Sequence, residues 1–100
     1  MQEIFDAAII GMGPGGEVVA DRLITAGKKV IVFESELIGG ECAYWACIPS
    51  KTVLRGTELK VETERTAGSS PVRLDWPKVQ DYRGYMARHV DDRTPAAGYE

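Results

Sequence analysis

The feature that most constrains the fold of this chain is a glycine-rich turn between two apolar runs. Residues 5–10 are almost continuously apolar, which predicts a buried parallel strand. Residues 15–26 carry apolar side chains at helical spacing, and Gly27 follows as an expected left-handed helix cap. Residues 29–34 predict a second buried strand. The chain is therefore expected to begin an α/β fold with a β-α-β unit, a parallel sheet and a right-handed crossover.

The turn itself matches the dinucleotide-binding pattern G-x-G-x-x-G in the run Gly11-Met12-Gly13-Pro14-Gly15-Gly16. The first glycine of such a motif allows the tight turn, the second lets the backbone approach a pyrophosphate, and the third lets the helix pack close to the strand. Glu34 ends the second predicted strand, where a carboxylate accepts hydrogen bonds from ribose hydroxyls. The alternative is a glycine-rich turn without a ligand, which the strand, the helix and the acid together disfavour. The pattern does not separate FAD from NAD.

The only two cysteines of the chain, Cys42 and Cys47, follow this unit. We expect residues 40–55 to form a bent or interrupted helix that carries both thiols, with the bend near Cys47 because Pro49 disfavours helical geometry before it. Two thiols across a bend can form a reducible bridge, so that one attacks an incoming disulfide and the other resolves the mixed intermediate or passes electrons on. The alternatives are inert buried thiols and a metal site. A structural zinc site takes four ligands, whereas the chain offers these two cysteines and a remote His89.

Composition argues against several functional classes. One hundred residues make about one small domain, and a net charge of −3 implies no general affinity for nucleic acid or an anionic membrane. No apolar run approaches the roughly 20 residues that span a bilayer. The acidic N-terminus does not resemble a secretion signal. We therefore expect a cytoplasmic protein, in which a close cysteine pair is more often redox-active than a static crosslink.

The remainder of the chain is more polar. Residues 57–71 predict a weak helix followed by a loop, and Asp75 predicts a helix N-cap with Pro77 in the first turn. One face of that helix carries the apolar residues Val79, Tyr82, Met86 and Val90. Residues 91–100 predict a loop. We expect His89 to lie on a surface helix and Trp76 to be a packing residue.

The predicted organisation is a single incomplete domain. It comprises a β-α-β unit at residues 1–35, a redox-cysteine helix at 36–56, and a loop plus amphipathic helix at 57–100. Only two strands are predicted, whereas a doubly wound domain needs at least a third to bury both faces of its sheet. We therefore expect either a longer parent protein or a sheet completed by another chain, with apolar surface that is exposed or covered by a partner.

Taken together, these motifs resemble the N-terminal end of the pyridine nucleotide-disulfide oxidoreductases. The resemblance rests on the glycine pattern, Glu34 and the run Gly39-Gly40-Glu41-Cys42-Ala43-Tyr44-Trp45-Ala46-Cys47-Ile48-Pro49-Ser50-Lys51. It covers residues 3 to about 55 and is weak beyond. The family includes dihydrolipoamide dehydrogenase, glutathione and mycothione reductases, and mercuric reductase. The resemblance implies an incomplete Rossmann-like FAD-binding domain, with NAD(P)H bound by a later fingerprint outside this chain.

Carried onto this sequence, the resemblance also implies roles for single residues. Cys42 would be the interchange thiol that meets substrate, and Cys47 would contact the flavin ring. Lys51 would lie near the flavin N5 edge and stabilise the reduced flavin. No metal ligands are implied. The sequence departs from the family at Glu41, where many members have threonine, because a carboxylate is a poor direct partner for the FAD phosphates. The implied FAD-binding set is Gly11, Gly13, Pro14, Gly15, Gly16, Glu34, Gly40, Glu41 and Lys51.

The implied reaction moves electrons from NAD(P)H through FAD to the Cys42–Cys47 disulfide and then to a small-molecule disulfide. It could also run in reverse from a dithiol, as in dihydrolipoamide dehydrogenase. Implied partners are the remainder of the enzyme and a homodimer partner that supplies a histidine–carboxylate pair. We expect the 100-residue chain alone to be inactive. Two alternatives stay open: a stand-alone nucleotide-binding or thiol redox-sensing module without turnover, and a non-productive truncation.

Overall fold

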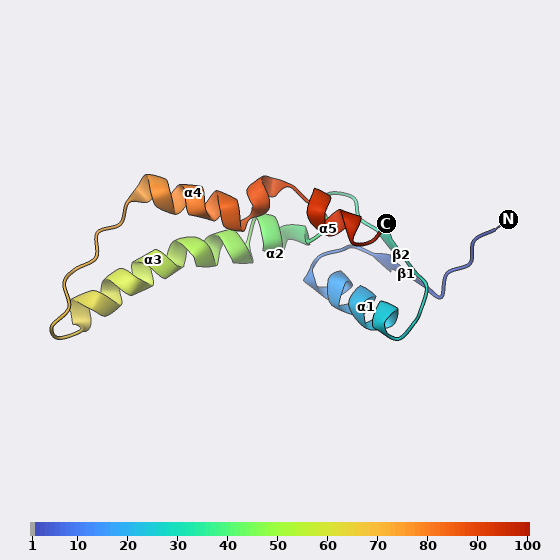
Figure 1. Cartoon of the computed structure of the whole chain (residues 1–100), viewed down its shortest axis with the longest axis horizontal. Helices are drawn as coiled ribbons and strands as arrows, with labels where there is room; N and C mark the ends of the chain where they lie inside the picture. The colour runs from blue at the N-terminus through green and yellow to red at the C-terminus, as the bar shows by residue number, and fades with distance from the viewer. Residues whose placement is uncertain (1) are drawn as a thin grey trace. The chain divides into compact units, whose positions relative to one another are not determined.

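The computed structural model describes residues 2–100, which divide into two compact units (Figure 1). The first unit contains residues 2–42 and returns at residues 91–100, and the second contains residues 43–90. Within the described residues, no helix combines the length and the apolar character that a membrane crossing requires.

The first unit begins with the predicted β-α-β arrangement. Strand β1 (Ala7–Ile10) is followed by helix α1 (Pro14–Thr25) and strand β2 (Val30–Phe33). The two strands pair in parallel, so that Ala7 lies opposite Val30 at one end of the ladder and Ile10 lies opposite Phe33 at the other. Gly27 follows α1 with a φ of +75°, as its predicted capping role requires. The parallel sheet and the α/β class are therefore confirmed.

The core of this unit lies on one side of the sheet. Ile9, Met12 and Ala20 are buried there, and Met12 is completely inaccessible to solvent. The prediction that both strands are buried is wrong, because Ile10 is 89% exposed and Phe33 is 53% exposed. Among the described residues the sheet has two strands, and side chains on one face lack a covering layer. The partly buried residues that pack on this core are Leu23, Val30, Val32, Ile38 and Tyr99.

The last ten residues belong to the first unit, although the sequence predicts only a loop there. Five of them form the short helix α5 (Arg93–Ala97). Tyr99 follows it and packs against the buried core of β1 and α1. Burial raises the pKa of the Tyr99 hydroxyl, and the nearby carboxylates of Glu17 and Asp21 raise it further. The predicted loop is therefore corrected to a helix that is anchored by an aromatic side chain.

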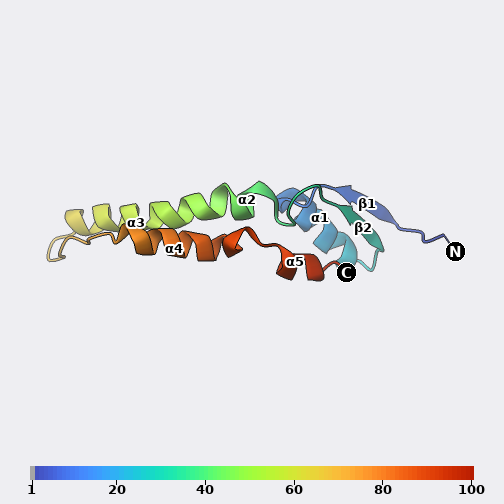
Figure 2. The ribbon, with the colours of Figure 1, turned by 90° about the horizontal axis from the view of Figure 1, so that it is seen from above.

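The second unit is a pair of helices that lie side by side and run antiparallel (Figures 1 and 2). Helix α3 (Cys47–Arg65) is followed by a loop and helix α4 (Trp76–Met86). Asp75 caps α4 by accepting a hydrogen bond from the Lys78 N–H at 3.3 Å, as the sequence predicts. Trp76 is 52% exposed, so its predicted packing role is wrong.

The helical interruption near the cysteines falls before Cys47. Helix α2 (Gly40–Tyr44) ends two residues ahead of α3, and Pro49 lies in the first turn of α3, where its missing N–H has no helical partner to lose. The proline therefore begins a helix rather than bending one. Helix α3 then runs through Gly56 to Arg65, beyond the expected end of the cysteine helix at residue 55.

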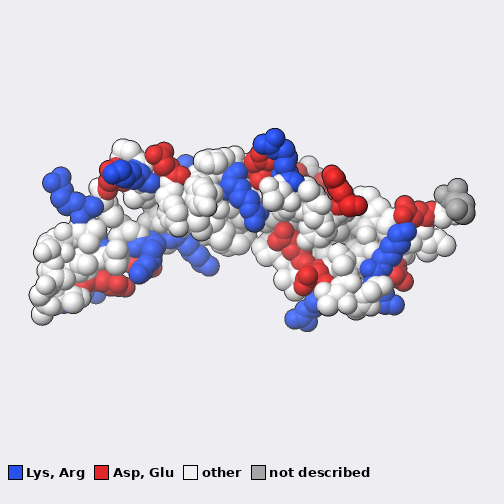
Figure 3. All heavy atoms as spheres, in the orientation of Figure 1, with Lys and Arg blue, Asp and Glu red and all other residues white. Residues whose placement is uncertain are grey.

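Exposed ion pairs lie along α3. Arg55 lies 3.7 Å from Glu58 and 3.8 Å from Glu62, and Lys60 pairs with Glu64. On the face shown in Figure 3, basic and acidic side chains are interspersed. Such pairs stabilise a long helix only slightly.

The end of α4 differs most from the sequence prediction. Val90 was expected to continue the apolar face of α4, but it lies in the short turn η1 (Arg88–Val90). The φ angles of Arg88, His89 and Val90 are +52°, +51° and +58°, a left-handed conformation that costs roughly 1 to 2 kcal/mol for each such residue. His89 therefore lies on this turn rather than on a surface helix, and its ring packs over Gly84.

Candidate functional site

The glycine turn has the backbone geometry that its motif demands. Gly11 has a φ of +92°, which few other residues tolerate. A Cβ atom placed on Gly16 would lie 1.9 Å from the carbonyl oxygen of Gly11, so a larger residue cannot occupy this position without moving the backbone. The third glycine thus permits the close contact between α1 and the turn that precedes it. Because the turn precedes α1 directly, the free N–H groups of the first helical turn lie at the turn.

Glu34 is bound to the same turn through backbone hydrogen bonds. Its Oε2 atom accepts from the Met12 N–H at 2.6 Å, and its Oε1 atom accepts from the Glu36 N–H at 3.1 Å. The bond from Met12, followed by that from Glu36, lowers the pKa of the Glu34 carboxyl below its ordinary value of 4.5. The carboxylate is therefore anionic at neutral pH. Each carboxylate oxygen can still accept a further hydrogen bond.

A hollow of about 370 Å³ lies beside this carboxylate in the first unit. It is placed at the carboxyl ends of both parallel strands, which is where open α/β sheets bind their ligands. Its lining includes both the first glycine of the motif and the acid that directly follows β2. The residues that line it are Ile10, Gly11, Phe33, Glu34 and Ser35.

The residues present fit a dinucleotide. The turn cannot accept a Cβ at Gly16, its helix offers N–H groups, and an anionic acceptor lies in the adjoining hollow. Gly13, Pro14 and Gly15 form the start of α1, and Pro14 and Gly15 are exposed. This arrangement suits a pyrophosphate at the helix start and a ribose at Glu34.

The run that carries the cysteines is packed directly against the glycine turn. Gly39 and Gly40 have left-handed φ angles of +117° and +65°. The Gly39 N–H donates to the Met12 carbonyl oxygen at 2.7 Å. A Cβ placed on Gly40 would lie only 2.6 Å from the Cα of Gly13. The two glycine motifs therefore meet backbone to backbone, two residues before Cys42.

The thiols lie on separate helices. Cys42 is the third residue of α2 and is half-buried, whereas Cys47 is the first residue of α3 and is exposed. Both are present as thiols. Cys42 closes the first part of the first unit, and Cys47 belongs to the second unit. Which thiol meets substrate and which meets flavin stays a prediction.

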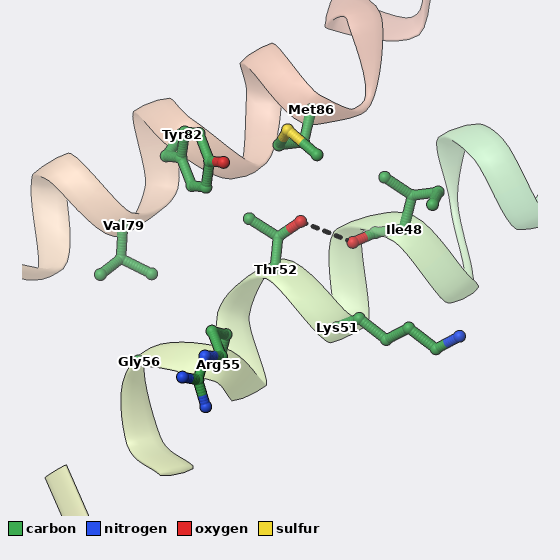
Figure 4. Close-up of a pocket in the computed structure, with 8 residues that line it drawn as sticks. All are labelled: Ile48, Lys51, Thr52, Arg55, Gly56, Val79, Tyr82 and Met86. Atoms are coloured by element: carbon green, nitrogen blue, oxygen red, sulfur yellow. Dashed lines mark hydrogen bonds between the residues drawn. The ribbon is translucent and has the colours of Figure 1, made fainter. Parts of the chain in front are cut away.

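The remaining predicted site residues are accessible to solvent. Glu41 is exposed on α2, so its carboxylate is not forced toward the glycine turn. Lys51 lies in the second turn of α3, and its side chain extends away from Tyr82 and Met86 (Figure 4). Its neighbour Thr52 donates a hydrogen bond to the Ile48 carbonyl oxygen at 2.7 Å. These residues border an apolar groove of about 380 Å³ between α3 and α4, lined by Ile48, Lys51, Thr52, Arg55, Gly56, Val79, Tyr82 and Met86.

Sequence reasoning missed two residues that support the site. Met12 lies inside the motif at a position that the pattern leaves open, yet its side chain is the fully buried centre of the first unit. Asp92 accepts a hydrogen bond from the Ile38 N–H at 2.7 Å, across 54 positions of sequence. An aspartate before a short helix reads as an N-cap, so no local signal could have revealed this long-range contact. Within residues 2–100, no cluster of three or more His, Cys, Asp or Glu side chains is arranged to hold a metal ion.

Comparison with known proteins agrees with this geometry. Residues 5–97 match the model of the family described as pyridine nucleotide-disulphide oxidoreductase. A dihydrolipoyl dehydrogenase from Rhizobium etli is 48% identical over 59 residues, which cover 59% of this chain and 12% of that protein. Another from Staphylococcus aureus is 37% identical over 89 residues, which cover 85% of this chain and 19% of that protein. The chain thus spans less than a fifth of the length of these relatives.

A solved structure shares the fold. It is the Cu(II) complex of the HOCl-induced flavoprotein disulfide reductase RclA from Escherichia coli, with a TM-score of 0.66 and 23% sequence identity. The match covers 89% of this chain and 18% of that chain. The likeness supports the Rossmann-like character of the described residues.

Proposed function

Because the chain belongs to the pyridine nucleotide-disulphide oxidoreductase family, we propose that it forms the FAD-binding and redox-cysteine part of a flavin-dependent NAD(P)H:disulfide oxidoreductase. The relatives named dihydrolipoyl dehydrogenase favour a reaction of that kind. One observation carries the proposal: the dinucleotide turn and the start of the cysteine helix touch at Gly13 and Gly40. The first unit therefore contains both the Cys42 thiol and the glycine turn that would bind the phosphates. We call this turn the phosphate cradle.

The first unit would bind the cofactor through its backbone and one acid. The N–H groups at the start of α1 would face the pyrophosphate, and Gly13 would let it approach closely. Glu34 would accept the ribose hydroxyls while it keeps its bonds to the Met12 and Glu36 N–H groups. Its negative charge disfavours a 2′-phosphate at this position. FAD, when bound, supplies the two-electron link between a nicotinamide and the thiol pair.

The cysteines would carry out disulfide exchange. The Cys42–Cys47 disulfide takes up two electrons and two protons and becomes two thiols. The thiolate of Cys42 then attacks one sulfur of an acceptor disulfide, the acceptor S–S bond breaks, and one product thiol leaves. The thiolate of Cys47 attacks Cys42 in the mixed disulfide, which releases the second product thiol and restores the intramolecular disulfide. The Lys51 ammonium would offset negative charge that develops on the reduced cofactor.

Further partners lie outside the described residues. We place NAD(P)H, an acid–base pair and the remaining FAD contacts on the rest of a longer enzyme and on a homodimer partner. The exposed side chains of Ile10 and Phe33 support this, since they leave an apolar sheet face for other strands or helices to cover. The acceptor would be a small-molecule disulfide or dithiol, and the location would be cytoplasmic.

A titration of the chain with FAD tests the proposal. We expect saturable quenching of flavin fluorescence, weakened by Glu34→Gln and unchanged by Glu36→Gln, which removes a neighbouring charge and keeps both backbone bonds to Glu34. In the wild type, reduction of the disulfide should produce a long-wavelength absorbance band from the Cys47 thiolate beside oxidised flavin. Cys42→Ser should show this band before any reductant is added, and Cys47→Ser should lack it. If FAD at millimolar concentration is not bound and the cysteines still interconvert reversibly with a disulfide, the chain is a thiol redox module instead.

A further inference from the structure

Asp92 begins helix α5 but does not cap it. An aspartate at this position ordinarily accepts a hydrogen bond from an N–H group of the first helical turn, as Asp75 does for α4. The Asp92 side chain makes no such bond to its own helix. Its Oδ2 atom instead accepts from the Ile38 N–H at 2.7 Å in a partly buried position. The carboxylate is thus directed toward a distant turn of the first unit.

That turn joins β2 to the cysteine helix. The Gly40 N–H donates to the Leu37 carbonyl oxygen at 3.1 Å, and the Gly39 N–H donates to the Met12 carbonyl oxygen at 2.7 Å. Two consecutive left-handed glycines give this segment a wide choice of backbone conformations. A further hydrogen bond to the turn, beyond these two backbone bonds, narrows that choice. Asp92 supplies a side-chain bond from outside the turn.

We propose that Asp92 is a positioning residue that fixes the turn at residues 37–40 and thereby sets the start of the cysteine helix against the dinucleotide turn. Its carboxylate selects the conformation in which Gly40 contacts Gly13. Cys42 follows two residues later, so its position relative to the cradle depends on the same bond. The consequences for FAD and thiol chemistry rest on the proposed function, whereas the role in holding the turn does not.

The neighbouring aspartate shows that this role is specific to Asp92. The Asp91 carboxylate binds the Arg93 guanidinium, with Oδ2 and Nε 2.8 Å apart. The side-chain hydrogen bonds from Arg93, followed by the bond from its backbone N–H, lower the pKa of the Asp91 carboxyl to about 2. Asp91 therefore engages its own segment, while Asp92 reaches Ile38. Tyr99 anchors the far end of the segment in the core of the first unit, so the segment is attached to that unit at both Asp92 and Tyr99.

Amide hydrogen exchange on the full chain tests the positioning role without FAD. We expect the Ile38 amide to exchange roughly tenfold faster in Asp92→Ala, because a hydrogen bond to a charged acceptor has an effect of that order on a local opening equilibrium. Asp92→Asn keeps an acceptor oxygen in the same place, so it should stay within about threefold of the wild type. Asp91→Ala is the matched control and should leave the Ile38 amide unchanged.

Thiol alkylation separates positioning from general destabilisation. In Asp92→Ala, the Cys42 rate should rise roughly tenfold relative to the Cys47 rate, with Asp92→Asn restoring the ratio. Equal changes at both thiols would show a merely structural role and overturn the proposal. So would an Ile38 amide that is unprotected in the wild type, a result that needs no variant.

Binding of FAD provides the last distinction. Asp92→Ala should weaken FAD binding and Asp91→Ala should not. If the wild-type chain does not bind FAD, the proposed function fails, while the exchange and alkylation results still decide the role of Asp92. Suppose that the Ile38 amide loses its protection in Asp92→Ala but FAD binds this variant as tightly as the wild type. The turn at residues 37–40 then does not influence the phosphate cradle, and that part of the proposal is wrong.

Discussion

The two units hold their candidate functional residues in different ways. In the first unit, backbone atoms meet directly at Gly11, Gly13, Gly16 and Gly40, and Glu34 is bonded to backbone N–H groups. In the second unit, two helices contact each other through apolar side chains, and their charged residues form exposed pairs. Lys51 and Cys47 extend from the second unit into solvent. The first site is thus defined by backbone geometry and the second by exposed side chains.

This difference between backbone contacts and side-chain contacts predicts where substitutions can be tolerated. A contact between backbones cannot adjust when a side chain is added, because neither partner can change rotamer. A contact between exposed side chains can be remade or lost to water at little cost. We therefore expect the first unit to respond sharply to small changes and the second to respond weakly, even for the same residue type.

A pair of methionines gives the largest expected contrast. Met12 is 0% exposed in the first unit, and Met86 is 40% exposed in the second. Met12→Ala should lower the free energy of unfolding by about 3 kcal/mol, because it leaves a cavity at the centre of the core. Met86→Ala should lower it by about 1 kcal/mol, since much of that side chain already contacts water. Urea unfolding of both variants measures the difference. Equal losses in the free energy of unfolding would contradict the expected contrast between the two units.

Gly40→Ala is the next largest expected change. The added Cβ would lie 2.6 Å from the Gly13 Cα, at a φ of +65°. Gly27→Ala is its matched control, because Gly27 has a φ of +75° in the same unit with no atom within 4 Å of the added Cβ. The control should cost about 1 kcal/mol for the left-handed backbone alone, and Gly40→Ala about 2 kcal/mol more from overpacking. Chemical denaturation compares them. Similar losses in the free energy of unfolding would mean that the two glycine turns are not in close steric contact.

Sequence reasoning succeeded in both units where the signals are local. The strand, the turn, the helix and Glu34 each follow from residues within one short stretch, and the β-α-β unit is confirmed. The predicted cap at Asp75 is confirmed for the same reason. What failed depends on contacts between distant residues. The helix at Arg93–Ala97 is short and polar, and it is anchored by Tyr99 in a core formed at the other end of the chain.

The candidate site shows the same limit. The motif glycines and Glu34 could be named because each has a defined task near a dinucleotide. The bonds from Ile38 to Asp92 and from Met12 to Glu34 join residues whose spacing carries no pattern. The burial of strands was overpredicted at Ile10 and Phe33, because an apolar side chain indicates a buried position without showing what covers it.

The pH dependence of unfolding tests the hydrogen bonds that hold Glu34 in the first unit. The Met12 N–H, and then the Glu36 N–H, lower the pKa of this carboxyl in the folded chain. Its contribution to stability is therefore complete above the ordinary value of 4.5 and is lost as pH falls through the lower folded value. Between neutral pH and pH values below 4.5, Glu34→Gln should show a shallower loss of stability than the wild type. Urea midpoints measured across this range test it, with Glu36→Gln as the control. Parallel profiles for the wild type and Glu34→Gln would contradict the bond to the turn.

The smallest effect is expected at an exposed ion pair of α3. Lys60 pairs with Glu64 one helical turn later, and both side chains are 43% exposed. Lys60→Gln should change the free energy of unfolding by at most about 0.5 kcal/mol, because water and salt screen such a pair and glutamine is also a good helix former. Unfolding at low and high salt measures the change, and the small difference from wild type should shrink further as salt rises. A loss comparable to that of Gly40→Ala would show that the second unit depends on its charges as strictly as the first depends on its backbone contacts.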